Sequence, residues 1–384
     1  MTDDHTFVFD DTRQPRIYCD KASVNAIRIF REMPVSLVDH AVRADMLWIR
    51  RGFSQLYNRL SRYQLLNHIP GEKQMVDKGR LTQALQTYSG SQTEFPFNLE
   101  DFYQQTYCLY LKDQAEDFLA GSAVAGETED LWILKPTDLS EGEGIKIISA
   151  RSEAKEFVTG SADGNSSQRD SYIAQKYIRR PLLLQQRKSE IRIYWIIACL
   201  EPLQVMMFHE GTVRLNSLPF RLADFDNQLV HITNVKQQYN HPDFDPNTVL
   251  KWSFDDLDAY LADTLQLTSA DFIDSQLKPQ LKQILAFVVR ATQQALISTP
   301  SNGLFFGLFG ADIILDDQLK PWLTEIQKGP SLSFDDSIKR KVIAPLIQKT
   351  AMLEIDLQAR FRRHEPIVQS DCPDGFEWVI NEAC

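Results

Sequence analysis

The sequence lacks the features that mark several large classes of protein. Its five cysteines include no CxxC pair, and their odd number and wide spacing argue against a disulfide framework or a zinc cage. Its seven histidines include no HExxH motif. The apolar runs are too short or too interrupted to span a bilayer, and the acidic start, MTDDHTFVFDD, is unlike a signal peptide. These absences predict a cytoplasmic protein in a reducing compartment.

The chain also lacks the basic surplus that binding to nucleic acids or anionic membranes requires. It has 41 Lys and Arg against 52 Asp and Glu, a formal net charge of -11 at pH 7. The apolar fraction of 43% and the charged fraction of 24% are ordinary for a globular protein, and 384 residues predict two or three domains. We therefore expect no nucleic acid and no membrane partner, and any site for an anion must be a local basic pocket.

Strand and helix signals alternate along the chain and predict a mixed α/β protein. Residues 16–50 have a βαβ-type pattern without GxGxxG at the first turn, so they do not indicate a dinucleotide site. Residues 190–200 and 204–215 are expected to pair as a hairpin turned at Glu201-Pro202. Farther on, the pattern predicts mostly helix over 253–297, strands over 304–316 and 319–327, and a long amphipathic helix over 334–362.

The stretch LKPWLTEIQKGPSL, residues 319–332, is an apolar strand that carries an acid and an amide. Simple alternation places Glu325 and Gln327 on one face together with Leu323, and Thr324 on the other. A carboxylate and a carboxamide side by side on one face of a strand indicate either a solvated edge or a site for a hard cation.

Asp312 adds a second acid to this part of the predicted sheet. It lies in the apolar strand FGADIIL, which a short turn connects to the strand that carries Glu325 and Gln327. Buried acids need a cation or hydrogen-bond donors, and two carboxylates with an amide oxygen suit Mg²⁺. The alternative is a pair of acids salt-bridged to Lys320 or Lys328.

Lys135 ends a predicted buried strand directly before the loop TDLSEGEG, which contains Gly142 and Gly144. A lysine in this position can act as a point charge for a phosphate while loop amides add donors. The alternative is an ordinary hairpin loop, since such loops often contain glycine.

A basic stretch runs from Gln175 to Arg192 and contains a single acid, Glu190. Lys188, Glu190 and Arg192 share one face as a strand begins, and this alternation of charge fits a triphosphate and its metal. Arg214 on the paired strand can add a second guanidinium. The alternative is an exposed basic face.

The segment HITNVKQ is predicted to be a loop that places His231, Thr233 and Asn234 together. Taken alone, it favours a hydrogen-bonded turn over a binding site.

Read in order, these segments resemble the tubulin tyrosine ligase-like family, a branch of the ATP-grasp ligases. The similarity covers about residues 67 to 335. The motifs are, in chain order, NHIP followed by Lys78, WILKP, EGEGI, QKYIRRPLLL, RKSEIRIY, EGTVRL, HITN, GADIILDDQLKPWLTEI and GPSL.

The resemblance implies an α/β (α+β) protein with an ATP-grasp fold and a nucleotide held between two α+β lobes. It divides the chain into a small Rossmann-like α/β domain over 1–66, a central lobe over 67–178 and a C-terminal lobe over 179–384. The implied reaction is ATP- and Mg²⁺-dependent amide formation through an acyl phosphate.

The resemblance also implies roles for individual residues. Together with the loop positions described above, the expected ATP-binding residues are Lys78, Lys135, Gly142, Gly144, Gln175, Lys176, Tyr177, Ile178, Lys188, Glu190 and Asn234. The expected Mg²⁺ ligands are Asp312, Glu325 and Gln327, and the expected catalytic residues are Arg192, Arg214 and Glu325.

Several positions depart from the family pattern, among them Lys328-Gly329, which replaces small residues before the final Pro. Glu190 stands where the family usually has Asp, Gln327 where it has Asn, and Glu141 where a basic residue is common. These departures keep open the alternatives of a weak or inactive ATP-binding member and of a kinase or nucleotidyl transferase on the same fold.

The expected partners are an amino-acid donor and a carboxylate-bearing peptide, protein or small-molecule acceptor. Tubulin is a doubtful acceptor on charge, because its acidic tails should not be drawn to a chain of net charge -11.

Overall fold

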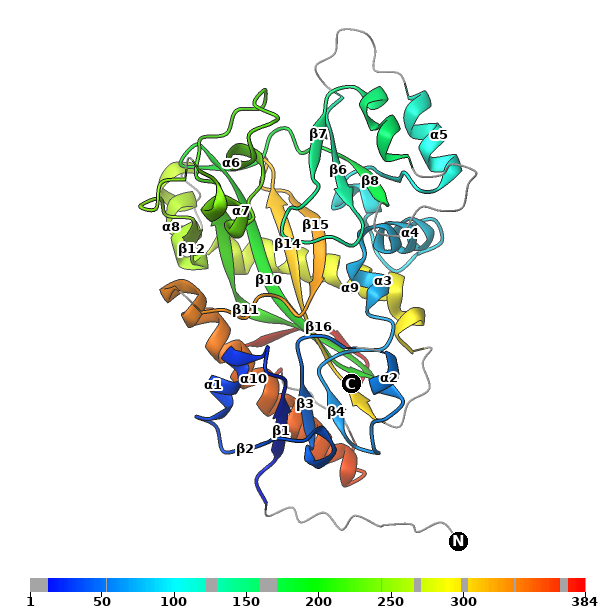
Figure 1. The fold of residues 1–384 in the computed structure, drawn as a ribbon, viewed down its shortest axis with the longest axis vertical. Coiled ribbons are helices and arrows are strands. Elements are labelled where there is room, and N and C mark those ends of the chain that lie inside the picture. Colours follow the sequence, from blue (N-terminus) through cyan, green and yellow to red (C-terminus); the bar gives the residue numbers. More distant parts are fainter. Residues whose placement is uncertain are drawn as a thin grey trace.

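The computed structural model describes residues 13–52, 54–121, 130–158, 171–242, 244–265, 271–297, 303–334, 336–366 and 372–383. Figure 1 shows an elongated molecule in which three sheets follow one another along the long axis, with helices packed around them. The mixed α/β fold predicted from the sequence is confirmed. The domain boundaries at residues 66 and 178 stay predictions.

The N-terminal sheet is parallel and lies at the bottom of Figure 1. Helix α1, Val24–Phe30, connects its first two strands, which confirms the predicted βαβ pattern. The strand order is β13-β4-β3-β1-β2, so its edge strand comes from far along the chain. The strands are β1 Arg16–Cys19, β2 Ser36–Val38, β3 Met46–Trp48, β4 Leu65–Leu66 and β13 Leu304–Phe305. Helix α2 spans Ser54–Tyr57.

A four-stranded antiparallel sheet occupies the upper right of Figure 1, in the order β5-β8-β6-β7. Its apolar face packs Phe118 of α5, Lys112–Ala120, edge-on against Trp132 of β6. The strands are β5 Thr106–Cys108, β6 Trp132–Pro136, β7 Lys146–Ile148 and β8 Tyr172–Lys176. Helices α3, Lys73–Val76, and α4, Lys78–Ser89, connect this sheet to the rest of the molecule.

The largest sheet lies between the other two and is built on the predicted hairpin. Strands β10 and β11 pair in antiparallel register on either side of Glu201-Pro202. The strands are β9 Leu183–Leu184, β10 Arg187–Leu200, β11 Leu203–Leu215, β12 Lys251–Trp252, β14 Gly307–Leu315, β15 Pro321–Lys328 and β16 Phe376–Asn381. The remaining helices are α6 Gln228–His231, α7 Val235–Asn240, α8 Phe254–Leu265, α9 Lys278–Ile297 and α10 Ser337–Arg362.

Strand β10 shows why this sheet is buried on both faces. Ile193, Trp195 and Ile197 belong to the apolar core that includes α9, whereas Tyr194 and Ile196 belong to the core that includes α10. Alternate residues of a strand share a face, so the face of Tyr194 and Ile196 continues to the start of β10. There its side chains are charged rather than apolar. The functional candidates of the sequence therefore lie at one end of an otherwise apolar sheet face.

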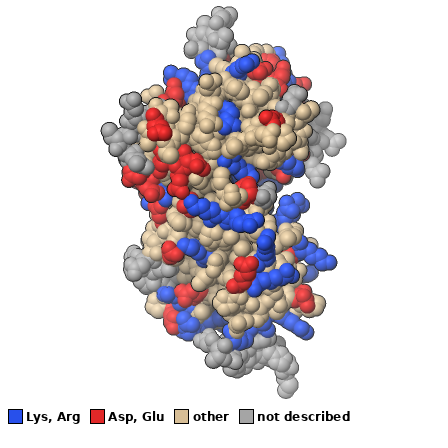
Figure 2. Space-filling model, turned by 90° about the vertical axis from the view of Figure 1, so that its left-hand side faces the viewer, with Lys and Arg blue, Asp and Glu red and all other residues tan. Residues whose placement is uncertain are grey.

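Charge is unevenly distributed on the face of the molecule shown in Figure 2, where acidic side chains gather above basic ones that cross the middle. Lys341 of α10 and Asp255 of α8 form an ion pair of 3.0 Å. Within the described part of the chain, no helix is long and apolar enough to cross a membrane. The four described cysteines, Cys19, Cys108, Cys199 and Cys372, are free.

Candidate nucleotide and metal site

Asp312 is the centre of the predicted metal set and is 3% exposed. In the sheet it lies opposite Arg192 of β10 on one side and Glu325 of β15 on the other. Arg192 donates from Nε to Oδ1 at 2.5 Å and from Nη2 to Oδ2 at 2.7 Å, and Arg214 Nη2 also donates to Oδ1. Burial alone would lower the pKa of Arg192, but the Asp312 carboxylate outweighs burial and raises that pKa.

Glu325 and Gln327 lie beside Asp312, as predicted. Lys78, the first residue of α4, brings its Nζ within 3.2 Å of Glu325 Oε2, and Gln327 Nε2 donates to Glu325 Oε1. Gln327 Oε1 accepts from Arg192 Nη2 at 2.8 Å, so one guanidinium joins Gln327 to Asp312. Although burial raises the pKa of Glu325, Lys78 and its other neighbours outweigh burial and lower that pKa to about 2.

Lys320 and Lys328, the alternative partners of these acids, lie elsewhere. Lys320 Nζ is 3.6 Å from Asp101 Oδ1, and Lys328 Nζ is 3.5 Å from Glu72 Oε1. The buried acids are thus compensated by two arginines and by Lys78, which the local sequence did not indicate as partners.

The predicted alternation along β15 is wrong because the strand contains a β-bulge. Asp312 pairs with Glu325, but the next residue of β14, Ile313, pairs with Leu323, which leaves Thr324 as the extra residue. Leu323 therefore faces the apolar core, and Thr324 faces the site with Glu325. The sequence does contain a sign of this bulge. Two adjacent polar residues, Thr324 and Glu325, lie between the core residues Leu323 and Ile326, which are three positions apart instead of two.

Two buried lysines lie next to the acids. Lys135, 8% exposed, donates to Gln175 Oε1 at 2.7 Å and to the Thr324 carbonyl at 3.5 Å. Lys188, 4% exposed, donates to the Tyr177 hydroxyl at 3.2 Å and to a backbone carbonyl, that of His231, at 2.9 Å.

These acceptors are neutral oxygens, so neither hydrogen-bond set neutralises its ammonium group. Burial lowers the pKa of Lys135 to about 8, against the opposing effect of Glu325, and it lowers the pKa of Lys188 to about 8, against that of Glu190. A buried ammonium group without a carboxylate partner is costly, and an anionic ligand relieves that cost. The pair is therefore suited to phosphate oxygens.

The segment predicted to bind adenine contributes unequally to the site. Gln175 accepts from Lys135 and donates to Thr106 Oγ1 at 3.0 Å. The Tyr177 hydroxyl is 2.8 Å from His231 Nδ1, and burial, reinforced by Lys188, lowers the pKa of His231 to about 4.

The other two residues of this segment, Lys176 and Ile178, do not form hydrogen bonds with Lys135 or Lys188. Lys176 donates instead to Asp130 at 2.7 Å. Ile178 is partly buried just after β8.

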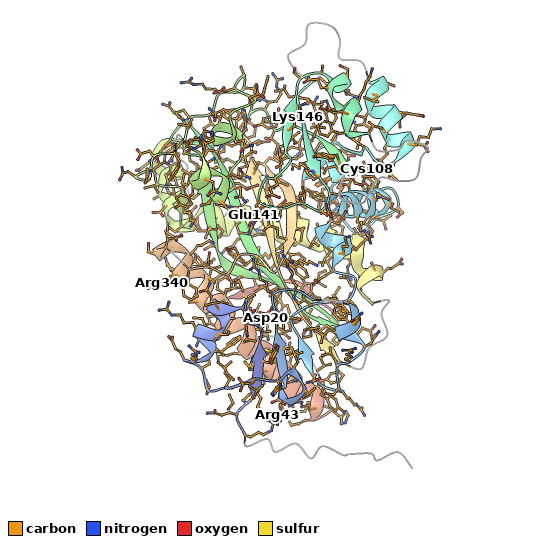
Figure 3. All side chains as sticks on the ribbon, viewed as in Figure 1. Asp20, Arg43, Cys108, Glu141, Lys146 and Arg340 are labelled. Atoms are coloured by element: carbon orange, nitrogen blue, oxygen red, sulfur yellow. The ribbon has the colours of Figure 1, made fainter. Side chains whose placement is uncertain are left out.

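The predicted phosphate loop lies between β6 and β7. Lys78 Nζ donates to the Leu139 carbonyl at 2.8 Å, which ties the loop to the acid cluster. Glu141, labelled in Figure 3, pairs with Lys236 of α7. Gly142 has φ +81° and Gly144 φ +70°, a backbone conformation that favours glycine.

The segment 231–237 differs from the loop that the sequence predicted. It comprises the end of α6, a short connection and the start of α7. Asn234 caps α7, because its Oδ1 accepts from the amides of Lys236 at 3.0 Å and Gln237 at 3.3 Å. Thr233 donates to Glu190 Oε2 at 2.6 Å, so Thr233 rather than Asn234 bonds to the acid cluster.

The donor set fits Mg²⁺ in chemical type. Within the described ranges, no three His, Cys, Asp or Glu side chains lie close enough together to hold a metal ion. The expected set is of a different kind, because it combines the carboxylates of Asp312 and Glu325 with the amide oxygen of Gln327. Mg²⁺ usually takes few protein oxygens and completes its shell with phosphates and water. Arg214 Nε is buried and has no hydrogen-bond acceptor among the described residues, which indicates a place for an anion.

The fold and the site together define the class. A mixed α/β fold with acids and buried lysines gathered where two sheets approach is consistent with an ATP-grasp-like fold. The chain belongs to the tubulin-tyrosine ligase family, whose profile matches residues 56–361.

Curated relatives agree with this assignment. The chain is 26% identical over 374 residues to Probable tubulin polyglutamylase TTLL9 of Bos taurus, covering 88% of this chain and 76% of the relative. It is 30% identical over 316 residues to Probable tubulin polyglutamylase TTLL2 of Homo sapiens, covering 79% and 49%. It is 28% identical over 228 residues to Tubulin glycylase 3B of Tetrahymena thermophila, covering 59% and 18%.

Proposed function

We propose that this chain is an ATP- and Mg²⁺-dependent ligase that joins an amino acid to a carboxylate-bearing acceptor through an amide bond. One observation carries the proposal. Two buried lysines, Lys135 and Lys188, donate to neutral oxygens beside a cluster of paired acids. Buried positive charge without carboxylate partners, next to hard oxygen ligands, suits a nucleotide triphosphate and its metal.

The residues divide into three roles. Lys78, Lys135 and Lys188 bind the nucleotide, next to the predicted phosphate loop that Lys78 contacts through the Leu139 carbonyl. Asp312, Glu325 and Gln327 would hold Mg²⁺, which supplies charge neutralisation at the phosphates. The buried, unpartnered Nε of Arg214 supports a role for that side chain in binding a carboxylate or phosphate oxygen.

The chemistry requires two substitutions. A carboxylate oxygen attacks the γ-phosphorus of ATP, the bond to the β-phosphate oxygen breaks, and ADP leaves. An amine nitrogen then attacks the acyl carbon, loses one proton, and inorganic phosphate leaves. Arg192 and Arg214 stabilise the negative charge that develops on the oxygens in both steps.

A protein acceptor is the first choice, because the relatives named above are two probable tubulin polyglutamylases and a tubulin glycylase. The expected cytoplasmic location stays part of the proposal. Tubulin itself stays disfavoured by the net charge of -11, and it is therefore tested against other acceptors.

The test incubates the purified chain with ATP, Mg²⁺ and labelled glutamate or glycine, with tubulin or a cell extract as acceptor. We expect ADP release and a product heavier by glutamyl or glycyl residues. Tight ATP binding without turnover on any acceptor favours a binding protein. A phosphorylated or nucleotidylated product favours a kinase or nucleotidyl transferase.

Glu325→Gln is the informative variant, because it removes the carboxylate charge from the expected metal set while keeping the side-chain size. We expect turnover to fall by about 100-fold or more, with a small change in unfolding midpoint. Glu116→Gln, on the exposed face of α5, is the matched control and keeps full turnover. Undiminished activity of Glu325→Gln contradicts the metal assignment.

A further inference from the structure

Thr324, the extra residue of the β15 bulge, contacts both an acidic and a basic side chain. Its hydroxyl is 3.0 Å from Glu190 Oε1 and 3.0 Å from the Asp312 carbonyl. Its own carbonyl accepts from Lys135 Nζ at 3.5 Å. The hydroxyl has one hydrogen, so it donates fully to only one of its two acceptors at a time.

Glu190 is held by groups that come from different elements. Thr233 donates to Oε2 at 2.6 Å, and Arg214 Nη2 is 3.5 Å from the same oxygen. Oε1 instead accepts from Thr324. The direction of this carboxylate therefore depends on two threonine hydroxyls.

Both buried lysines are electrostatic neighbours of Glu190, although both donate to neutral oxygens. Glu190 acts to raise the pKa of Lys135 and of Lys188, against the larger lowering by burial. In a buried site, a carboxylate that loses a donor gains most by turning to a cation. Arg214 already lies 3.5 Å from Oε2, and Lys135 lies 3.5 Å from the carbonyl of Thr324, the residue that donates to Oε1. A turn of Oε1 toward Lys135 would neutralise the charge that the nucleotide needs.

We propose that Thr324 is a positioning residue that holds the Glu190 carboxylate away from Lys135 and Lys188, so that both ammonium groups stay free for the nucleotide phosphates. This inference rests on the proposed function. The bulge makes it possible, because in a regular strand Thr324 and Glu325 would face opposite sides.

The first test measures the Kd of Mg-ATP by calorimetry. Thr324→Val removes the hydroxyl and keeps the branched shape, and we expect binding weaker by about 10–100-fold, since the hydrogen bond is to a charged group. Thr324→Ser restores the hydroxyl, and we expect a Kd within about threefold of the wild type. Thr292→Val is the matched control, since it deletes a buried hydroxyl bonded to the Val288 carbonyl on α9.

A double-mutant cycle separates positioning from packing. If Thr324 acts through the charge of Glu190, Thr324→Val weakens binding in the wild type and has no added effect in a Glu190→Gln background. A second readout is pH. Because the pKa of Lys135 is lowered to about 8, we expect affinity for Mg-ATP to fall as the pH rises past 8 and the amine loses its proton. In Thr324→Val this fall moves to higher pH, because Lys135 paired with Glu190 holds its proton more tightly.

The outcomes separate the two proposals. A wild-type chain that does not bind Mg-ATP overturns the proposed function. A wild-type chain that binds, with Thr324→Val binding equally well, overturns the inference alone. Loss of affinity in Thr324→Ser as large as in Thr324→Val, or an effect of Thr324→Val that persists in Glu190→Gln, assigns Thr324 to packing and also overturns it.

Discussion

At the scale of single residues, we expect the two buried lysines to make the proposed binding of nucleotide depend on pH. In the free protein, burial lowers the pKa of Lys135 and of Lys188 to about 8. Nucleotide phosphates favour the protonated amines and raise both values on binding. Below about pH 7 the amines are almost fully protonated, so affinity is insensitive to their titration. Above pH 8 they must take up protons to bind, so affinity falls.

We expect the Kd of Mg-ATP to be flat up to about pH 7, to begin rising as the pH approaches 8, and well above pH 8 to rise by up to about tenfold per pH unit for each lysine. Calorimetry in buffers of different ionisation enthalpy checks this and should detect proton uptake at pH 8.5. Lys188→Met should reduce the slope by half. An affinity that stays constant up to pH 9.5 contradicts the free charge of these lysines.

At the scale of elements, the bulge in β15 predicts an unusual tolerance to deletion. Removing Thr324 places Leu323 directly before Glu325, so that both keep their present partners, Ile313 and Asp312, in a regular ladder. We expect this deletion to keep the fold while weakening Mg-ATP binding. Circular dichroism and urea unfolding measure the fold, and calorimetry measures the binding.

Deleting Ile326 is the matched control. It removes a core side chain and turns Gln327 toward the apolar face of the sheet. We expect a loss of about 3 kcal/mol or more in the free energy of unfolding. If the two deletions destabilise the chain equally, the bulge assignment is wrong.

The elements themselves were largely predictable from the sequence. Long apolar runs interrupted at Glu201-Pro202 predicted the hairpin of β10 and β11, because local patterning and a turn signal coincide there. The acid cluster was predictable for a similar reason. Polar residues in apolar strands are costly, and a short turn brings Asp312 and Glu325 into register.

The partners of these charged groups were not predictable from local pattern. Arg192 and Lys78, which pair with Asp312 and Glu325, come from elements far away along the chain. The capping role of Asn234 was missed because α7 is too short for its periodicity to identify a helix start. Simple alternation also could not reveal the bulge at Thr324, since a single inserted residue reverses the face of everything before it.

At the scale of the whole molecule, net charge is a weak guide to the acceptor. The value of -11 averages over a surface on which Figure 2 shows acidic side chains gathered above a row of basic ones. Long-range attraction of an acceptor depends on the local electrostatic potential near the site as well as on the net charge. The doubt about tubulin is therefore settled by direct comparison of acceptors at several salt concentrations.

The N-terminal sheet and the C-terminal helix are joined by buried hydrogen bonds. Gln358 Nε2 of α10 donates to the carbonyls of Asp45 at 2.7 Å and Tyr63 at 2.6 Å. We expect Gln358→Ala to cost about 1–3 kcal/mol, because two buried carbonyls lose their donor. Hydrogen exchange should show lower protection in β3 and β4. Gln280→Ala, on an exposed part of α9, is the control and should change neither quantity.

A change confined to α10 in the Gln358→Ala exchange pattern would contradict this coupling. The coupled result instead means that the N-terminal sheet and α10 unfold together, so that stability measured in one reports on both.

The N-terminal sheet also has a consequence for synthesis. Its edge strand β13, Leu304–Phe305, pairs with β4, Leu65–Leu66, although more than half of the chain lies between them. At about 5–20 residues per second, the edge of β4 stays open on the ribosome for on the order of tens of seconds. During that time the nascent chain exposes an unpaired strand, the kind of edge that chaperones protect. A fragment that ends before residue 304 keeps that edge open permanently.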